Sequence, residues 1–350
     1  MSKATLRIEQ YQTVHFDTNV NPMGTPDSVK KAIQENIDAV VAYPEVYYDN
    51  LKRSISMYTR APEDNVVLGN GSSDILRLFA ALVMPKKSLL ISPGPIEYSH
   101  VLKSYGSEIE YFDLSEEDNY EIDLAQLCHS LDSSFDMIII SNPNNPTSKS
   151  IDRESMEILA KTCQELGIFL LIDEMYIEFT DNEEVLNSIP LTAYYQNIAV
   201  MRSVSKFFAV PGIRLAYAIH SNPENIEIIN ITGMKNNLAS LSAVAGTVML
   251  GDKSYIEASK SMIHTERSLV YLAMSTCKTI KLFKPEANFM LAKLLKEDIF
   301  AKDVADHCRT RGIIIRDCND IRGLSNKFIR FSFMKPKQND LMVNTILEIV

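Results

Sequence analysis

Two polar clusters that follow apolar runs carry the residue types best suited to covalent and acid–base chemistry. In Ser203–Arg214 (SVSKFFAVPGIR), Lys206 stands beside apolar residues. An amine held in such surroundings has a lowered pKa and attacks carbonyl groups. Asp173 ends the apolar run Ile168–Asp173, where a carboxylate is costly unless it is paired; a helix N-cap is the alternative role. Together the two side chains require a ligand with an aldehyde and a basic ring nitrogen.

Two further clusters supply groups for a phosphate and for polar ring substituents. Leu68–Asp74 (LGNGSSD) precedes an apparent helix from Ile75, and glycines and serines there present free N–H groups to an anion, or form a plain cap. Ser141–Thr147 (SNPNNPT) holds amides between prolines, more rigidly than a turn alone requires. Pyridoxal 5′-phosphate has the phosphate, the aldehyde and the ring nitrogen that all four clusters require.

The elements that must position these clusters are strands of a mainly parallel sheet. Four runs that are apolar on both faces predict buried strands: 88–92, 137–141, 168–173 and 198–203. A helix is predicted over Asp152–Leu166 with Gly167 as its stop, so strand, helix and strand form a parallel crossover. The strand Arg214–His220 follows a loop too short for a helix and is expected to run antiparallel near the sheet edge. Ligands bind beyond the carboxyl ends of such strands.

The pattern changes after about Tyr255, which predicts a second, smaller α+β domain. A long helical stretch is followed by the strand Asn288–Leu295, a helix near Ala301–Arg311, and strands at Gly312–Arg316 and Phe328–Phe333. We therefore expect three parts: an N-terminal segment, 1–40, packing with the small domain; a large domain, 41–254, that binds the cofactor; and a small domain, 255–350.

Composition excludes several other classes of protein. The 350 residues include 35 Lys+Arg and 45 Asp+Glu, a net charge of −10, which disfavours binding to nucleic acid or to anionic membranes. The five cysteines form no Cys-x-x-Cys and the six histidines lack ligand spacing, so neither a disulfide scaffold nor a metal site is expected. The first residues, MSKATLRIEQYQ, lack the apolar core that a signal peptide has, and no apolar run reaches about 18 residues. We expect a soluble, cytoplasmic protein.

From about Phe16 onward, the joint pattern resembles the fold-type-I pyridoxal-phosphate enzymes of the aspartate-aminotransferase superfamily. The resemblance implies an α/β fold in which helices flank a mainly parallel large-domain sheet, with a smaller α+β domain. It implies that Lys206 bonds to the cofactor and moves protons at Cα, and that Asp173 pairs with the ring nitrogen. Asn145 and Tyr176 would bind the phenolic oxygen. The implied ring-stacking residue is Tyr98, and the implied phosphate ligands are Ser72, Ser73, Ser203, Ser205 and Arg214.

The same resemblance implies a substrate site and a partner. Tyr43, in Ala42–Pro44, resembles the tyrosine that reaches the phosphate of a neighbouring subunit, which implies a homodimer with shared active sites. Arg330 resembles the arginine that binds the substrate α-carboxylate, and Arg316 resembles a residue that contacts a phosphate at the far end of the substrate, a surface ion pair being its alternative role. Further active-site positions are Asn19, Asn145 and Asn288.

Two groups within the superfamily resemble the chain most. The segments 16–26, 93–98, 202–217 and 315–324 resemble the L-threonine-O-3-phosphate decarboxylases of cobamide biosynthesis. Histidinol-phosphate aminotransferases are the alternative, because Tyr176 is the residue type that aminotransferases keep and no His-Gly-Gly phosphate motif precedes Phe16. We expect a decarboxylase (a lyase) of phosphothreonine or phosphoserine that yields an aminoalcohol phosphate for cobalamin biosynthesis. A non-catalytic binding protein is a third possibility, disfavoured because Lys206, Asp173 and Arg330 are all present.

Overall fold

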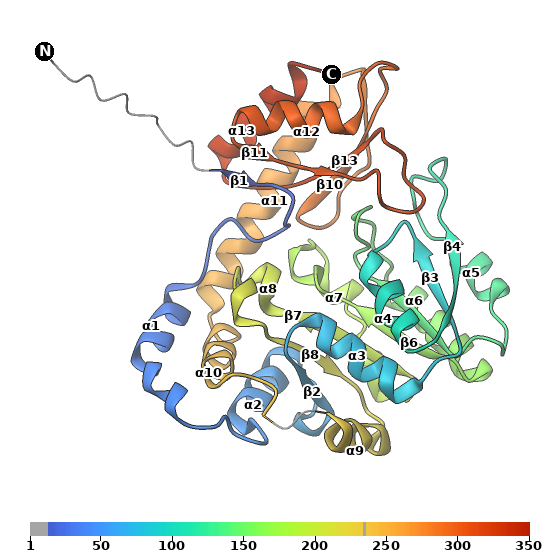
Figure 1. Cartoon of the computed structure of the whole chain (residues 1–350), viewed down its shortest axis with the longest axis vertical. Helices are drawn as coiled ribbons and strands as arrows, with labels where there is room; N and C mark the ends of the chain where they lie inside the picture. Colours follow the sequence, from blue (N-terminus) through green and yellow to red (C-terminus); the bar gives the residue numbers. More distant parts are fainter. Residues whose placement is uncertain (1–12, 234–235) are drawn as a thin grey trace, which may run out of the picture.

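The structure is a computed structural model that describes residues 13–233 and 236–350. The first twelve residues of the predicted segment 1–40 lie outside the described residues. Figure 1 shows two parts: a large sheet with its helices below, a smaller sheet above, and the long helix α11 (Lys253–Ser275) running between them. In the described part of the chain, no helix is both long and apolar enough to cross a membrane.

The large sheet has seven strands in the order β2-β8-β7-β6-β5-β3-β4. The pairs from β7 through β4 are parallel, whereas β8 is antiparallel to both β7 and β2. The predicted antiparallel strand near the edge is therefore confirmed. The bounds are β2 Val66–Gly69, β3 Lys87–Ser92, β4 Glu108–Asp113, β5 Met137–Ser141, β6 Phe169–Asp173, β7 Ile198–Ser203 and β8 Ala216–Ile219.

Helices cover both faces of this sheet, which is why every residue of its central strands β5, β6 and β7 is buried. Along β5, Ile138 and Ile140 belong to the core that includes α6 (Arg153–Leu166), while Ile139 belongs to the core of α3 and α4. As predicted, α6 ends at Gly167, whose φ is +76°. The other helices of the part built on the large sheet are α1 Asp27–Glu35, α2 Asp49–Thr59, α3 Ser72–Val83, α4 Ile96–Ser104, α5 Leu124–Ser130, α7 Glu183–Leu186, α8 Val204–Phe207, α9 Pro223–Thr232 and α10 Ser240–Met249.

The smaller sheet has the order β12-β13-β10-β9, all antiparallel. Its strands are β9 Ile280–Leu282, β10 Phe289–Leu294, β12 Arg316–Asp317 and β13 Phe328–Ser332, and helices α12 Ala301–Thr310 and α13 Pro336–Leu347 complete this part. The single strand predicted over 312–316 is wrong: β11 (Ile313–Ile314) pairs with β1 (Val14–His15), and only β12 joins β13. Because β1 joins β11 while α1 packs on α10, the N-terminal segment contacts both parts. The three-part division stays a prediction.

Candidate active site

A cavity of about 340 Å³ opens at the carboxyl ends of the parallel strands. It collects side chains from β5, β6, α3, α4, α8 and β13, segments that are far apart in the sequence. The residues predicted for the site that line it are Ser72, Ser73, Tyr98, Asn145, Asp173, Tyr176, Ser205, Lys206, Arg214 and Arg330. Residues on its wall that the sequence reading did not single out include Asp17, Thr18 and Glu97. Glu97 directly precedes Tyr98 in the motif PGPIEY, so its position beside a predicted site residue is the sequence signal that could have identified it.

Asp173 is a buried carboxyl group that has only neutral partners. Tyr98 Oη donates a hydrogen bond of 2.6 Å to Oδ2, and the backbone N–H of Met175 donates one of 2.9 Å to Oδ1. Burial raises the pKa of Asp173 to about 6, and these two hydrogen bonds only partly oppose it. No cationic side chain of residues 13–233 or 236–350 forms an ion pair with it. The site therefore fits a ligand that brings a protonated ring nitrogen. Tyr98 lies in the cavity as predicted, but its hydroxyl is bound to this carboxylate.

Lys206 lies in the one-turn helix α8, which begins directly after β7. Its Nζ donates a hydrogen bond of 2.8 Å to the carbonyl of Thr18. Burial, followed by the positive charge of Arg330, lowers the pKa of the amine, which raises its neutral, nucleophilic fraction. A helix in this loop was not expected from the sequence. The turn forms because Ser203 Oγ accepts a hydrogen bond from the Ser205 N–H and caps it.

Three of the predicted phosphate ligands, Ser72, Ser73 and Arg214, lie at the N-terminus of α3. This helix begins at Ser72 and not at Ile75, because Gly71 turns the chain at a φ of +86°. A Cβ on Gly71 would collide with the Arg214 guanidinium, so glycine is required for the close approach. Arg214 donates a hydrogen bond of 3.4 Å to the Pro211 carbonyl and lacks a carboxylate partner in the described part of the chain. A helix N-terminus beside such an uncompensated guanidinium suits a phosphate. Ser203 lies behind the cavity wall, where its Oγ is 2.9 Å from Ser205 Oγ.

Arg330, on β13, is a buried cation whose partners are also neutral. Its Nη1 donates a 2.6 Å hydrogen bond to Asn145 Oδ1, and its Nη2 donates to the Asp17 carbonyl. The side chain is 7 % exposed and its Nε has no partner. A buried charge is costly unless an ion of opposite sign compensates it. Since no carboxylate among the described residues does so, the site fits an anionic ligand group.

The remaining predicted residues lie outside the cavity. Asn19 and Asn288 are buried behind Tyr176: Asn19 Nδ2 lies 3.4 Å from Tyr176 Oη, and Asn288 Nδ2 donates to the Asn19 carbonyl at 2.9 Å. Arg316, on β12, donates from Nη2 to both carboxylate oxygens of Asp320 at 2.6 and 2.7 Å. Tyr43 is 91 % exposed and does not reach the cavity of its own chain.

The fold and this cavity define an enzyme family. The chain belongs to the class I and II aminotransferases, whose family model matches residues 11–346. The cofactor of these enzymes is pyridoxal 5′-phosphate, and the lysine, the buried aspartate and the phosphate cradle described above fit it.

The relatives found by comparison name two activities. The threonine-phosphate decarboxylase of Salmonella typhimurium is 29% identical over 345 residues, covering 99% of this chain and 93% of that protein. The solved structure of the histidinol-phosphate aminotransferase from Clostridium acetobutylicum has a TM-score of 0.89 and 31% identity, covering 96% of this chain and 98% of that one. The L-threonine-O-3-phosphate decarboxylase of Porphyromonas gingivalis has a TM-score of 0.84 at 21% identity, covering 96% and 98%, and so shares the fold.

Proposed function

We propose that the protein is a pyridoxal-phosphate-dependent decarboxylase of an O-phosphorylated L-amino acid, phosphothreonine or phosphoserine. Its product would be an aminoalcohol phosphate for cobamide biosynthesis. The relationship to the Salmonella decarboxylase over nearly the whole chain supports this activity. The one methyl group that separates the two substrates is worth only about 1–3 kcal/mol in a pocket, so both remain candidates.

The observation that carries the proposal is a pair of arginines on neighbouring strands. Arg316 of β12 and Arg330 of β13 are direct register partners in an antiparallel pair. Side chains of such partners leave the same face of a sheet, with their Cβ atoms roughly 5 Å apart. Arg330 reaches the cofactor cavity. Two arginines on adjacent strands suit a substrate with a carboxylate at one end and a second anion at the other, and phosphothreonine and phosphoserine both have this form.

In this mechanism the chain's residues bind and orient the substrate. The cofactor, when bound, supplies an acceptor for the electrons of the bond that breaks at Cα. To direct this chemistry to the bond between Cα and the carboxylate, the chain's residues would have to fix the rotation of the substrate about Cα. We propose that Arg316, with Arg322, fixes this rotation through the phosphate, while Arg330 contacts the carboxylate. Lys206 then delivers a proton to Cα.

The two arginines proposed to bind the substrate phosphate, Arg316 and Arg322, each contact a carboxylate of the protein. Arg322 pairs with Asp113 at 2.8 Å, and Arg316 contacts Asp320 through Nη2 alone. This contact leaves Arg316 Nε and Nη1 to donate to a phosphate, because neither has a partner among the described residues. Asp320 would then orient the guanidinium as well as balance its charge.

Replacing Arg316 with alanine tests the proposed phosphate contact. We expect KM for phosphothreonine to rise about 10- to 100-fold, since a hydrogen bond to a charged group is lost, while the cofactor dissociation constant stays within about twofold. Steady-state kinetics and cofactor titration measure the two quantities. Arg309→Ala is the matched control, because Arg309 lies on α12 in an exposed pair with Asp306. Equal losses for substrate and cofactor would contradict the proposal.

The alternative function is that of a histidinol-phosphate aminotransferase. Tyr176 favours it, because aminotransferases keep a tyrosine at this position and here its hydroxyl lies at the cavity, 3.4 Å from Asn19 Nδ2. The likeness to the Clostridium acetobutylicum structure supports it as well. Such an enzyme would use Lys206 to move the Cα proton and would release no CO2.

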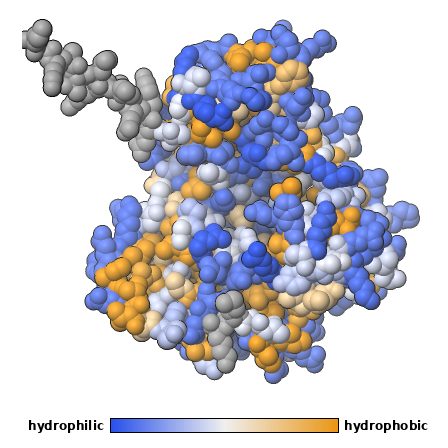
Figure 2. All heavy atoms as spheres, in the orientation of Figure 1, coloured by the Kyte–Doolittle hydropathy of each residue, from blue (hydrophilic) through white to orange (hydrophobic). Residues whose placement is uncertain are grey.

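We also propose a homodimer in which Tyr43 reaches the partner's cofactor phosphate. Tyr43 stands in an apolar, strongly exposed segment that includes Val40, Val41, Val46 and Tyr47, each at least 53 % exposed. Hydrophobic surface gathers in Figure 2 on the side where Figure 1 places α1, the helix before this segment. Contiguous apolar surface of this kind is typical of subunit interfaces. The cytoplasmic location stays a prediction.

A further inference from the structure

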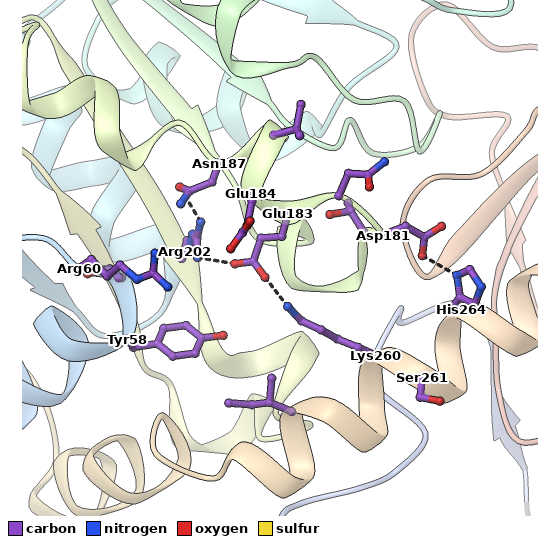
Figure 3. Close-up of a pocket in the computed structure, with 15 residues that line it drawn as sticks. Tyr58, Arg60, Asp181, Glu183, Glu184, Asn187, Arg202, Lys260, Ser261 and His264 are labelled. Carbon is purple, nitrogen blue, oxygen red and sulfur yellow. Dashed lines mark hydrogen bonds and ion pairs between the residues drawn. The ribbon is translucent and has the colours of Figure 1, made fainter.

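A second polar cluster lies on the face of the large sheet opposite the cofactor cavity. It lines a separate cavity of about 750 Å³ between α2, the segment around α7, and α11. In Figure 3, dashed lines join Arg202 to Glu183 and Glu183 to Lys260 across this cavity. None of the three side chains lines the cofactor cavity.

The centre of this cluster is a buried ion pair between two adjacent strand ends. Arg202 donates to Glu174 Oε2 from Nε at 3.0 Å and from Nη2 at 2.8 Å. The two residues are 2 % and 0 % exposed. Glu174 Oε1 accepts the Ser188 N–H at 2.6 Å, and Asn187 Oδ1 accepts from Arg202 Nη2 at 2.9 Å. Both charges are therefore compensated and hydrogen-bonded inside the protein.

The sequence positions of this pair connect it to the cofactor site. Glu174 directly follows Asp173, and Arg202 directly precedes Ser203. Asp173 and Met201 are register partners that both line the cofactor cavity. Because successive strand residues point to opposite faces, Glu174 and Arg202 point to the other side. The ion pair thus links the strand that carries the aspartate to the strand that leads into Ser203, Ser205 and Lys206.

The pair continues outward to the helix between the two sheets. Arg202 Nη1 donates to Glu183 Oε1 at 3.3 Å, and Lys260 Nζ donates to Glu183 Oε2 at 2.5 Å. Lys260 lies on α11, which also packs against α13 and β9 of the smaller part. The outer members are less buried than the inner pair, since the Lys260 side chain is 37 % exposed. Lys260 can therefore be replaced without opening the core.

We propose that Glu174 and Arg202 are positioning residues for the cofactor, and that Glu183 and Lys260 hold Arg202 in place from α11. A buried ion pair contributes little net stability, because desolvation offsets its attraction. What this one provides is a fixed separation of the ends of β6 and β7. That separation sets the distance between Asp173, which would pair with the ring nitrogen of the bound cofactor, and Ser205 and Lys206, which would hold other groups of it.

The test measures cofactor affinity in the holoenzyme, separately from stability. Holoenzymes of Arg202→Lys and Lys260→Met are diluted, and the fraction of cofactor still bound at equilibrium gives the dissociation constant. We expect about a 10- to 30-fold loss of affinity for Arg202→Lys, which keeps the charge but not the two-point contact, and about a 3- to 10-fold loss for Lys260→Met. Lys260→Arg, which keeps a positive charge at this position, should bind the cofactor with the affinity of the parent, unlike Lys260→Met.

Lys253→Met is the matched control, because Lys253 is an exposed lysine of the same helix with no ion pair among the described residues. Its affinity should equal that of the parent. If Arg202→Lys does not fold, Lys260→Met and its arginine rescue still decide the question. A Lys260→Met holoenzyme whose thermal midpoint falls while its cofactor affinity stays within twofold of the parent would overturn the proposal. Equal losses in Lys260→Met and Lys253→Met would overturn it as well.

Discussion

Lys206→Ala is expected to lower turnover roughly 10⁴-fold and to remove the absorbance band near the visible edge that the covalently bound cofactor gives. In the proposed site the amine would both bond to the cofactor and move the proton at Cα, so one substitution would remove nucleophilic and acid–base catalysis together. Lys206 is the lysine that lines the cofactor cavity, and burial lowers its pKa. Absorbance spectra and single-turnover rates measure the two effects.

A matched control separates this chemistry from a general loss of structure. Lys161→Ala removes an exposed lysine of α6, 66 % exposed and 4.0 Å from Glu165, and should leave both the spectrum and the rate unchanged. A Lys206→Ala protein that binds the cofactor but retains the visible-edge band would show that another amine forms the bond. Retention of parental turnover would contradict the account of the site.

Arg330→Ala should give the second large effect, a fall of about 10²- to 10³-fold in kcat/KM. The guanidinium is buried among neutral acceptors, so its charge is compensated only when an anion binds, and an interaction of this kind is worth several kcal/mol. Arg330→Lys should recover only part of the loss, since an ammonium lacks the planar fork that matches a carboxylate. Kinetics with phosphothreonine as the varied substrate measure both variants.

The same substitution has an expected effect on the pH profile. Arg330 contributes to the lowered pKa of Lys206, after burial itself. Without that positive charge the ammonium form of Lys206 is less disfavoured, so its pKa rises towards the ordinary lysine value. The neutral amine then forms only at higher pH. The pH at which the rate of covalent cofactor attachment rises should therefore shift to a higher value. A rise at the same pH as in the parent would show that Arg330 does not act on the lysine.

Much of the cofactor site could be predicted from the sequence, because its residues are tied to strand ends. Asp173 ends β6, and Lys206 follows β7 by three residues. Buried parallel strands are recognisable as apolar runs, and their carboxyl ends meet at one edge of the sheet. The predicted strands were therefore sufficient to predict that Asp173 and Lys206 lie close together.

The features that could not be predicted depend on contacts between side chains that are distant in the sequence, or on which strand a short segment pairs with. The segment 312–316 (GIIIR) has the pattern of one strand, yet it divides between two sheets because β11 pairs with β1 and β12 pairs with β13. The bond from Tyr98 to Asp173 joins residues 75 positions apart. Arg202 reads as a polar residue at a strand end, and only the fold shows that it is buried against Glu174.

The most direct test of the central claim is to identify the products. Holoenzyme is incubated with O-phospho-L-threonine and with O-phospho-L-serine, and CO2 and aminoalcohol phosphate are measured. A parallel reaction contains histidinol phosphate and 2-oxoglutarate and is assayed for glutamate. The account predicts CO2 and an equal amount of aminoalcohol phosphate from at least one phosphoamino acid, with no glutamate in the parallel reaction. Glutamate formation without CO2 would contradict it and would identify an aminotransferase.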